Sequence, residues 1–232
     1  MKLAVIIPTL NEAHFIGRLV THLKTAPYHA QLEIYVCDGG SSDNTVDIAT
    51  EHGATVLKTG SKGRALQMNA GASQTKADVL YFVHADTLPP VSFYSDIKKA
   101  VEAGYCIGAY RQCFDSPKLL LKVNAWFTRF PYLWCRGGDQ SIFVERQLFE
   151  ELNGFDERFI IMEEYDLMVR AAAKSRFKVM HGKTLVSARK YSHNSWLTVM
   201  LANRKALRMF RKKEPPELIL TMYRNRLQNT TK

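Results

Sequence analysis

Two side chains with metal-binding chemistry, His84 and Asp86, follow an apolar run that ends at Val83. Asp86 comes between the run VLYFV and a break at Pro89 and Pro90, so we expect it at the end of a buried strand. A carboxylate at such an edge, with an imidazole two residues earlier, can hold Mg²⁺ or Mn²⁺ on a phosphate substrate, where one or two protein carboxylates suffice. The alternative is a turn aspartate before a proline-rich loop.

The first two apolar runs of the chain also end in polar residues. These candidate ligand contacts are Pro8, Thr9, Asn11, Glu12 and Asp38. Ligands of open parallel sheets bind beyond the carboxyl ends of the strands, which favours a binding role. Thr9 or Asn11 can instead cap the helix that begins near residue 13. Asp38 precedes two glycines and lies too early to cap a helix, so we interpret it as a ligand contact.

Two cations, Lys62 and Arg64, stand at the start of a helical pattern that spans residues 64–73 and contains Asn69. The first backbone N–H groups and the dipole of a helix favour an anion, and the two cations add to this preference. A diphosphate would fit such a site. The alternative is a solvated loop with two exposed cations.

The second half of the chain carries a further set of acids and amides. Glu163 and Glu164 open a helical pattern directly after Met162, and Asp139 and Gln140 precede another short strand pattern. Acids in a first helical turn commonly complement the helix dipole. The functional alternative is that one of the two glutamates is a general base that takes a proton from an acceptor hydroxyl.

The elements that must position these residues follow an alternation of strand and helix patterns. Strand patterns are expected at 3–7, 32–37, 55–58, 79–83, 106–114, 141–145 and 177–180, and helices include 64–73, 119–130 and 165–175. Parallel strands need covering crossovers, so this alternation predicts an α/β fold, a mainly parallel central sheet flanked by helices.

Six motifs occur in a fixed order: PTLNE, DGGSSDNT, KGRALQMNAGA, HAD, GDQ and MEEYD. Together they resemble the family 2 inverting glycosyltransferases with the GT-A fold, and more narrowly a bacterial branch of short single-domain members. The resemblance covers roughly residues 3–190. It implies a GT-A domain over residues 1–190, and residues 191–232 are expected to add basic amphipathic helices to the same unit.

The resemblance also implies an activity: a divalent ion assists transfer of a sugar from a UDP- or GDP-sugar to an acceptor hydroxyl, with inversion. In the family, the nucleotide pocket is lined by the positions that match Pro8, Thr9, Asn11, Glu12 and Asp38. The positions beside the nucleotide and diphosphate match Lys62, Arg64 and Asn69. The segment at the donor sugar and acceptor matches Asp139 and Gln140.

The resemblance assigns the metal and the base as well. Asp86 matches the metal-binding last Asp of the family's Asp-x-Asp motif, whereas His84 stands in place of the first. Glu164 stands at the base position, where the family usually has Asp, so either Glu163 or Glu164 is the base. A late histidine is a metal ligand in some GT-A enzymes, which makes His193 a further candidate, although a lone surface histidine is the simpler interpretation.

The net charge of +10 is concentrated at one end of the chain. Residues 181–232 hold 12 Lys and Arg and 2 Asp and Glu; the totals of 32 and 22 therefore leave 20 of each in residues 1–180. A neutral body argues against nucleic acid as a partner. On a helical wheel, residues 195–213 place an apolar arc beside a basic one, and such a helix can lie on an anionic membrane or pack on the core. If the helix lies on a membrane, we expect a lipid-linked acceptor.

The scattered cysteines and the lack of a visible signal peptide or membrane span predict a cytoplasmic protein, with any membrane contact on the inner face of the cell membrane. Two other functions stay open. A nucleotidyltransferase would need a glycine-rich basic loop after the first strand, and PTLNE has no glycine. A non-catalytic module would bind a nucleotide sugar or a membrane without transferring the sugar.

Overall fold

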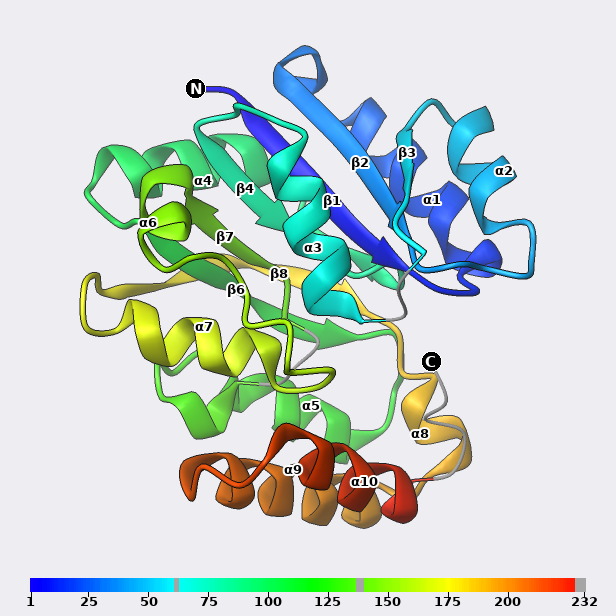
Figure 1. Cartoon of the computed structure of the whole chain (residues 1–232), viewed down its shortest axis with the longest axis vertical. Helices are drawn as coiled ribbons and strands as arrows, with labels where there is room; N and C mark the ends of the chain where they lie inside the picture. Colours follow the sequence, from blue (N-terminus) through cyan, green and yellow to red (C-terminus); the bar gives the residue numbers. More distant parts are fainter. Residues whose placement is uncertain (61–62, 137–139, 228–232) are drawn as a thin grey trace.

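The computed structural model describes residues 1–60, 63–136 and 140–227. Its first half is a parallel sheet of β1 (Leu3–Thr9), β2 (Leu32–Asp38), β3 (Thr55–Lys58) and β4 (Val79–Phe82), in the order β3-β2-β1-β4 (Figure 1). All seven residues of β1 are buried because helices cover both faces of the sheet. The predicted α/β fold is confirmed.

Alternate residues of β1 pack into two separate cores. Leu3, Val5 and Ile7 pack with α1 (Ala13–Thr25) and α4 (Phe93–Glu102), and α2 (Thr45–Glu51) adds Ala49 to this core. Ala4 and Ile6 face the other core, which contains α3 (Arg64–Ser73), α6 (Arg146–Glu151) and α7 (Glu163–Ala171). This is the period-2 alternation of a strand between two helical layers.

Helix α3 approaches the sheet closely because of a glycine. A Cβ atom on Gly71 would lie 2.5 Å from Ile6 Cγ2 and 2.7 Å from Cys37 Sγ. A larger residue at this position would therefore force α3 away from β1 and β2. Since Arg64 begins α3, the same close packing fixes where this cation lies relative to the carboxyl ends of the strands.

The second half extends the sheet with antiparallel pairing. β7 (Ile142–Glu145) pairs antiparallel with β4 and with β6 (Ile107–Phe114), and β8 (Phe177–Val186) pairs parallel with β6. The two-residue β5 (Thr87–Leu88) pairs antiparallel with the end of β8, with Thr87 opposite Val186. The last residues of β8 are thereby brought beside Asp86, whose carbonyl accepts a 3.1 Å hydrogen bond from Ser187 N.

Several elements differ from their predicted extents. β8 continues six residues past the predicted end at Met180 because both β6 and β5 pair with its more polar second half. α5 (Leu119–Phe127) ends earlier than predicted, and α7 begins at Glu163, before its predicted start at residue 165. The short η1 (His29–Gln31), η2 (Leu133–Cys135) and α8 (Lys190–His193) carry little periodic signal.

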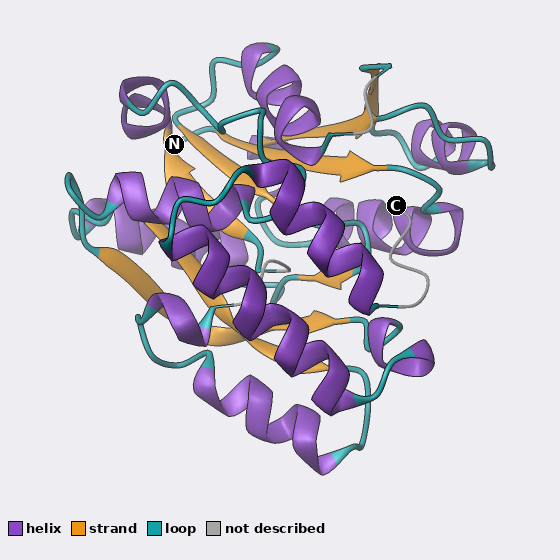
Figure 2. Cartoon of the chain, turned by 60° about the horizontal axis from the view of Figure 1, so that its bottom comes forward, coloured by secondary structure: helices purple, strands orange, loops and turns teal. Residues whose placement is uncertain are grey.

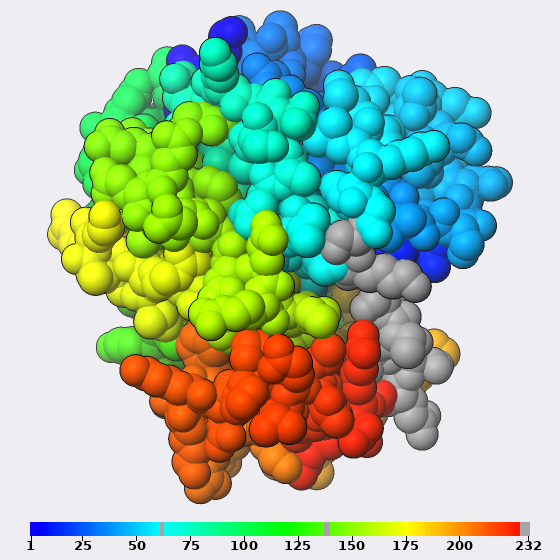
Figure 3. All heavy atoms as spheres, viewed as in Figure 1, coloured from blue at the N-terminus to red at the C-terminus, as the bar shows by residue number. Residues whose placement is uncertain are grey.

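The chain ends in a helix pair, α9 (Trp196–Arg211) and α10 (Pro216–Arg226), which forms the lower edge of the molecule in Figure 3 and comes to the front in Figure 2. Val199, Ala202 and Ala206 of α9 are buried, and Leu207 and Phe210 pack on the main core. The apolar arc of α9 is therefore used for packing, and its basic arc is exposed. No helix in the described ranges is both long and apolar enough to cross a membrane. The division at residue 190 stays a prediction.

Candidate functional site

A cavity of about 1290 Å³ opens where β1, β4 and β8 end. Its other walls come from α5, α9, α10 and the start of α7. The predicted site residues that line it are Pro8, Thr9, Glu12, Arg64, His84 and Asp86. The fold therefore gathers residues that the sequence places in three separate motifs, as expected at the carboxyl edge of an open α/β sheet.

Arg189 joins two of these motifs and was not predicted. Its guanidinium pairs with both carboxylate oxygens of Glu12 at 2.8 and 2.9 Å, and Nη2 also lies 2.7 Å from Asp86 Oδ2. It packs 4.8 Å from the ring centroid of Phe15. Glu12 is 177 residues away in the chain. Arg189 reaches the site because β5 pairs with the end of β8, and no local sequence pattern signals that pairing.

The arrangement around Asp86 tests whether a divalent ion fits. In the described residues, no three or more His, Cys, Asp or Glu side chains are grouped as a metal site. Asp86 alone suits an ion held largely by substrate phosphates and water, with the carboxylate side chain 14% exposed. Arg189 engages this carboxylate, so a divalent ion would compete with or share the place of the guanidinium.

His84 contacts the acid pair. Its Nε2 atom lies 2.9 Å from Glu164 Oε1, although the two residues are 80 positions apart. The predicted metal-ligand role of His84 stays a prediction, and it would use Nδ1, because Nε2 lies against Glu164. Glu164 is 1% exposed, and its Oε2 atom accepts no hydrogen bond from the described residues. His84 lines the cavity and Glu164 lies behind it.

Glu163, the other predicted base, is fully buried, and Arg64 Nε lies 2.8 Å from its Oε1 atom. Burial raises the pKa of Glu163 to about 8, and the charge of Glu164 adds to the rise, while Arg64 opposes it. Both acids follow Met162, a buried residue with φ of 73° in the left-handed region. Such strained backbone persists only where its surroundings fix it.

The loops after β1 and β2 hold each other. Asp38 accepts hydrogen bonds from the backbone N–H groups of Gly40 and Ser41, both at 2.9 Å, so it holds its own loop, and its predicted contact with a ligand stays a prediction. Asn11 Oδ1 accepts a 2.9 Å bond from Ser42 N. The start of α1 is held by the other loop, since Ala13 N donates to Asp43 Oδ2 at 3.2 Å. Neither Thr9 nor Asn11 caps α1.

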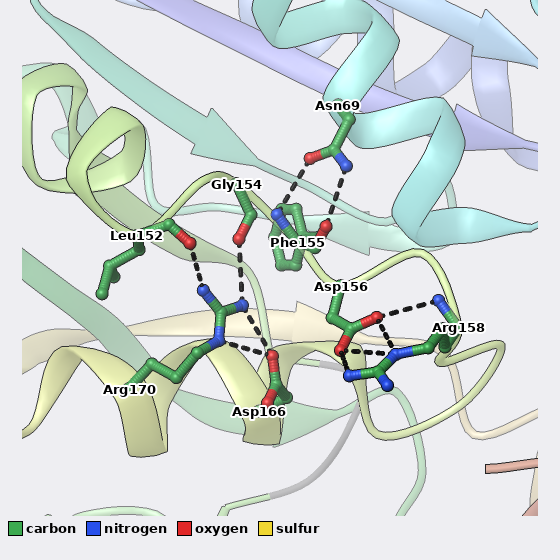
Figure 4. Close-up of polar contacts among 8 residues, drawn as sticks. All are labelled: Asn69, Leu152, Gly154, Phe155, Asp156, Arg158, Asp166 and Arg170. Carbon is green, nitrogen blue, oxygen red and sulfur yellow. Dashed lines mark hydrogen bonds and ion pairs between the residues drawn. The ribbon is translucent and has the colours of Figure 1, made fainter.

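Asn69 holds a loop rather than lining the cavity. Its Nδ2 atom donates to Phe155 O at 2.9 Å, and its Oδ1 accepts from Phe155 N at 2.9 Å (Figure 4). Nδ2 also donates to Glu157 Oε1 at 3.0 Å. Arg170 fixes the same loop through Gly154 O. The amide of Asn69 is thus occupied by the segment that leads to the acid pair, and its predicted place beside the nucleotide stays a prediction.

Of the remaining predicted contacts, Gln140 lies just before β7. Gln140 is buried, and its Oε1 accepts a 3.0 Å bond from Arg136 Nη1. Arg136 is itself buried, which lowers its pKa to about 10, and its carbonyl accepts a hydrogen bond from Tyr165. Lys62 and Asp139 lie outside the described residues. His193 is exposed and also borders the cavity, and its predicted metal-ligand role stays a prediction.

The mostly parallel sheet with its antiparallel extension has the GT-A fold, and acidic and cationic residues line the cavity at its strand ends. The chain belongs to glycosyl transferase family 2, whose family model matches residues 4–150. The predicted family and enzyme class are thereby confirmed.

Relatives and solved structures agree with this family. The chain is 25% identical over 195 residues to a probable glycosyltransferase, YdaM, of Bacillus subtilis, covering 73% of this chain and 46% of YdaM. It is 31% identical over 121 residues to an undecaprenyl-phosphate 4-deoxy-4-formamido-L-arabinose transferase of Klebsiella pneumoniae, covering 48% and 37%. The fold resembles a Pyrobaculum calidifontis mannosyltransferase solved with GDP-Man and Mn²⁺: TM-score 0.71, 18% identity, covering 95% and 68%. The chain thus spans less than half of either curated relative.

Proposed function

We propose that this glycosyltransferase moves a sugar from a UDP- or GDP-sugar to an acceptor hydroxyl with inversion, assisted by Mg²⁺ or Mn²⁺. One observation carries the proposal. Arg189, which pairs with the carboxylates of Glu12 and Asp86, lines the same cavity as His84, and His84 contacts Glu164. Leaving-group stabilisation and acceptor activation are the two functions that a displacement of a nucleoside diphosphate requires.

The leaving-group side would be built from charges of opposite sign. Arg64 at the start of α3 and Arg189 supply two guanidinium groups, which suit phosphate oxygens because of their planar donor geometry. Asp86 would hold a divalent ion, which supplies Lewis-acid neutralisation of the diphosphate when bound. Pro8, Thr9 and Glu12 line the same cavity and would contact the nucleotide, as the family resemblance implies. Asn11, Asp38 and Gln140 would act by holding the surrounding loops.

On the acceptor side we assign Glu164 as the base. Glu163 is fully buried against Arg64, and its raised pKa leaves it largely protonated at neutral pH, which suits a base poorly. Glu164 lies behind His84, which lines the cavity. In this proposal the imidazole passes the acceptor proton to Glu164 while the hydroxyl attacks the anomeric carbon from the face opposite the diphosphate.

The proposed acceptor and location rest on one relative. The Klebsiella relative is named an undecaprenyl-phosphate 4-deoxy-4-formamido-L-arabinose transferase. We propose a lipid-linked acceptor for this chain, used by a cytoplasmic protein at the inner face of the cell membrane.

A binding panel tests the proposal. UDP, GDP and their sugars would be titrated by calorimetry with Mn²⁺ or with EDTA, followed by release of nucleoside diphosphate during turnover. Glu164→Gln is expected to keep the donor affinity and to lower kcat by about a thousandfold, the range of a lost general base. Asp86→Ala is expected to abolish the effect of Mn²⁺ on donor affinity. Absence of any nucleotide binding, or an unchanged kcat in Glu164→Gln, would refute the respective assignment.

A further inference from the structure

An unusually apolar surface lies on α5 and the segment that follows it. Seven of the fourteen exposed large hydrophobic residues in the described chain fall within residues 119–134, and they are Leu119, Leu120, Val123, Trp126, Phe127, Tyr132 and Trp134. Within α5, positions 119, 123 and 126 follow helical spacing and share one face. Contiguous exposed apolar patches of this kind mark interaction sites in soluble proteins. We call these seven residues the aromatic surface.

The rings of this surface support one another. Trp126, Phe127, Trp134, Tyr132 and Phe130 form a closed circuit in which neighbouring ring centroids are 5.2 to 6.4 Å apart. Tyr132 and Trp134 stack with an interplanar angle of 4° while remaining 59% and 55% exposed. The rings are thus held in place by mutual contact without being covered. Trp and Tyr are the residues enriched where membranes meet water.

The charges around the aromatic surface are of one sign. Residues 116–136 contain four Lys and Arg and no Asp or Glu. Arg129 lies 4.5 Å from the Trp126 ring centroid. α5 lies between β6 and α9 (Figure 1), and Leu121 packs with Val199 and Ala202 of α9. The exposed basic arc of α9 therefore adjoins this surface: its Arg204, Arg208, Arg211 and Lys212 line the same cavity as Val123, Phe127 and Trp134.

We propose that the aromatic surface docks the protein on an anionic lipid bilayer, with the basic arc of α9 against the lipid headgroups. Apolar rings flanked by cations match a bilayer that is apolar inside and negatively charged at its surface. The sequence leaves open whether the apolar arc of α9 lies on a membrane or packs on the core. That arc packs on the core, so the proposal assigns the lipid contact to the aromatic surface instead. The proposal does not depend on glycosyl transfer, although it would place the cavity mouth at the membrane.

Vesicle binding tests the proposal on the full chain. Sedimentation with phosphatidylcholine vesicles is compared with and without phosphatidylglycerol, and intrinsic fluorescence is followed because Trp126 and Trp134 are two of the three tryptophans. The ring variant is Tyr132→Ser with Trp134→Ser. The matched control is Tyr28→Ser with Val91→Ser, whose side chains are 56% and 58% exposed elsewhere on the molecule. Circular dichroism establishes that each variant is folded.

The wild type is expected to bind vesicles that contain phosphatidylglycerol, with a blue shift of its fluorescence. The ring variant should bind at least about tenfold more weakly, since two rings no longer enter the interface. The control should match the wild type. Arg208→Gln with Arg211→Gln should lose about fivefold per charge, and salt should reduce that difference.

Three results would overturn the proposal. The first is a wild type that binds neither kind of vesicle, and the second is a ring variant that binds as well as its control. The third is a wild-type dimer in light scattering that the ring variant converts to a monomer, with no vesicle binding by either, because the aromatic surface would then be a contact between two copies. Donor binding, measured in parallel, separates each of these results from failure of the proposed enzymatic function.

Discussion

Replacement of Arg189 by alanine is the sharpest test of how the site is built. The substitution removes three contacts of 2.7 to 2.9 Å and leaves Glu12 and Asp86, whose side chains are 8% and 14% exposed, without this cation. A hydrogen bond to a charged group contributes about 1.5 to 3 kcal/mol. The Arg189 side chain is 35% exposed, so solvent screening reduces the sum. We therefore expect a loss of about 3 kcal/mol in the free energy of unfolding.

Thermal unfolding measures this loss. For a chain of this size, about 3 kcal/mol corresponds to a fall in Tm of roughly 6 to 12 °C. Arg189→Lys should recover part of the loss, because an ammonium cannot make the bidentate contact with Glu12. Arg158→Ala is the matched control, since Arg158 also pairs with an aspartate, Asp156, but its side chain is 78% exposed (Figure 4). No measurable change in Tm is expected for the control.

The same variant separates two roles of Arg189 in donor binding. If its guanidinium contacts the diphosphate, Arg189→Ala weakens UDP or GDP binding in EDTA by about tenfold or more, the effect of one lost charged contact. Since the substitution removes the competing guanidinium from Asp86, Mn²⁺ should then strengthen nucleotide binding more than it does in the wild type. A Tm within the error of the Arg158→Ala control, together with unchanged nucleotide affinity, would refute both the structural and the binding argument.

Two further predictions concern Glu163 and Asn69. The pKa of Glu163 is raised to about 8 in the folded state, from a usual value near 4.5. The unfolded state therefore releases this proton first, and stability falls as pH rises from about 4.5 to 8. Glu163→Gln should flatten this part of the pH profile of Tm, and an identical slope in both proteins would contradict the assignment. Asn69→Ala should lower the free energy of unfolding by about 2 to 3 kcal/mol in urea titrations through loss of its bonds to Phe155 and Glu157. Because Asn69 holds a loop, its substitution should change the affinity for the donor little. A large loss of donor affinity at unchanged stability would support the predicted place of Asn69 beside the nucleotide.

The amino-acid sequence by itself determined the fold class and most of the motifs. Apolar runs such as residues 3–7 and 79–83 are local signals, and each is long enough to specify a buried strand. Asp86 and the Glu163–Glu164 pair stand at element ends that local patterns locate well. The order of six motifs was enough to indicate the family, because each motif reflects a local turn or helix start.

The tertiary structure alone decided which of these groups meet. Arg189 and Glu12 are 177 residues apart, Asn69 and Phe155 are 86 apart, and His84 and Glu164 are 80 apart. These pairings depend on which strand edges become neighbours, and a two-residue strand such as β5 carries almost no periodic signal. A helical wheel likewise identifies the apolar arc of α9 but not whether core or lipid covers it, since both reward burial of the same side chains. Only the packed fold distinguished them.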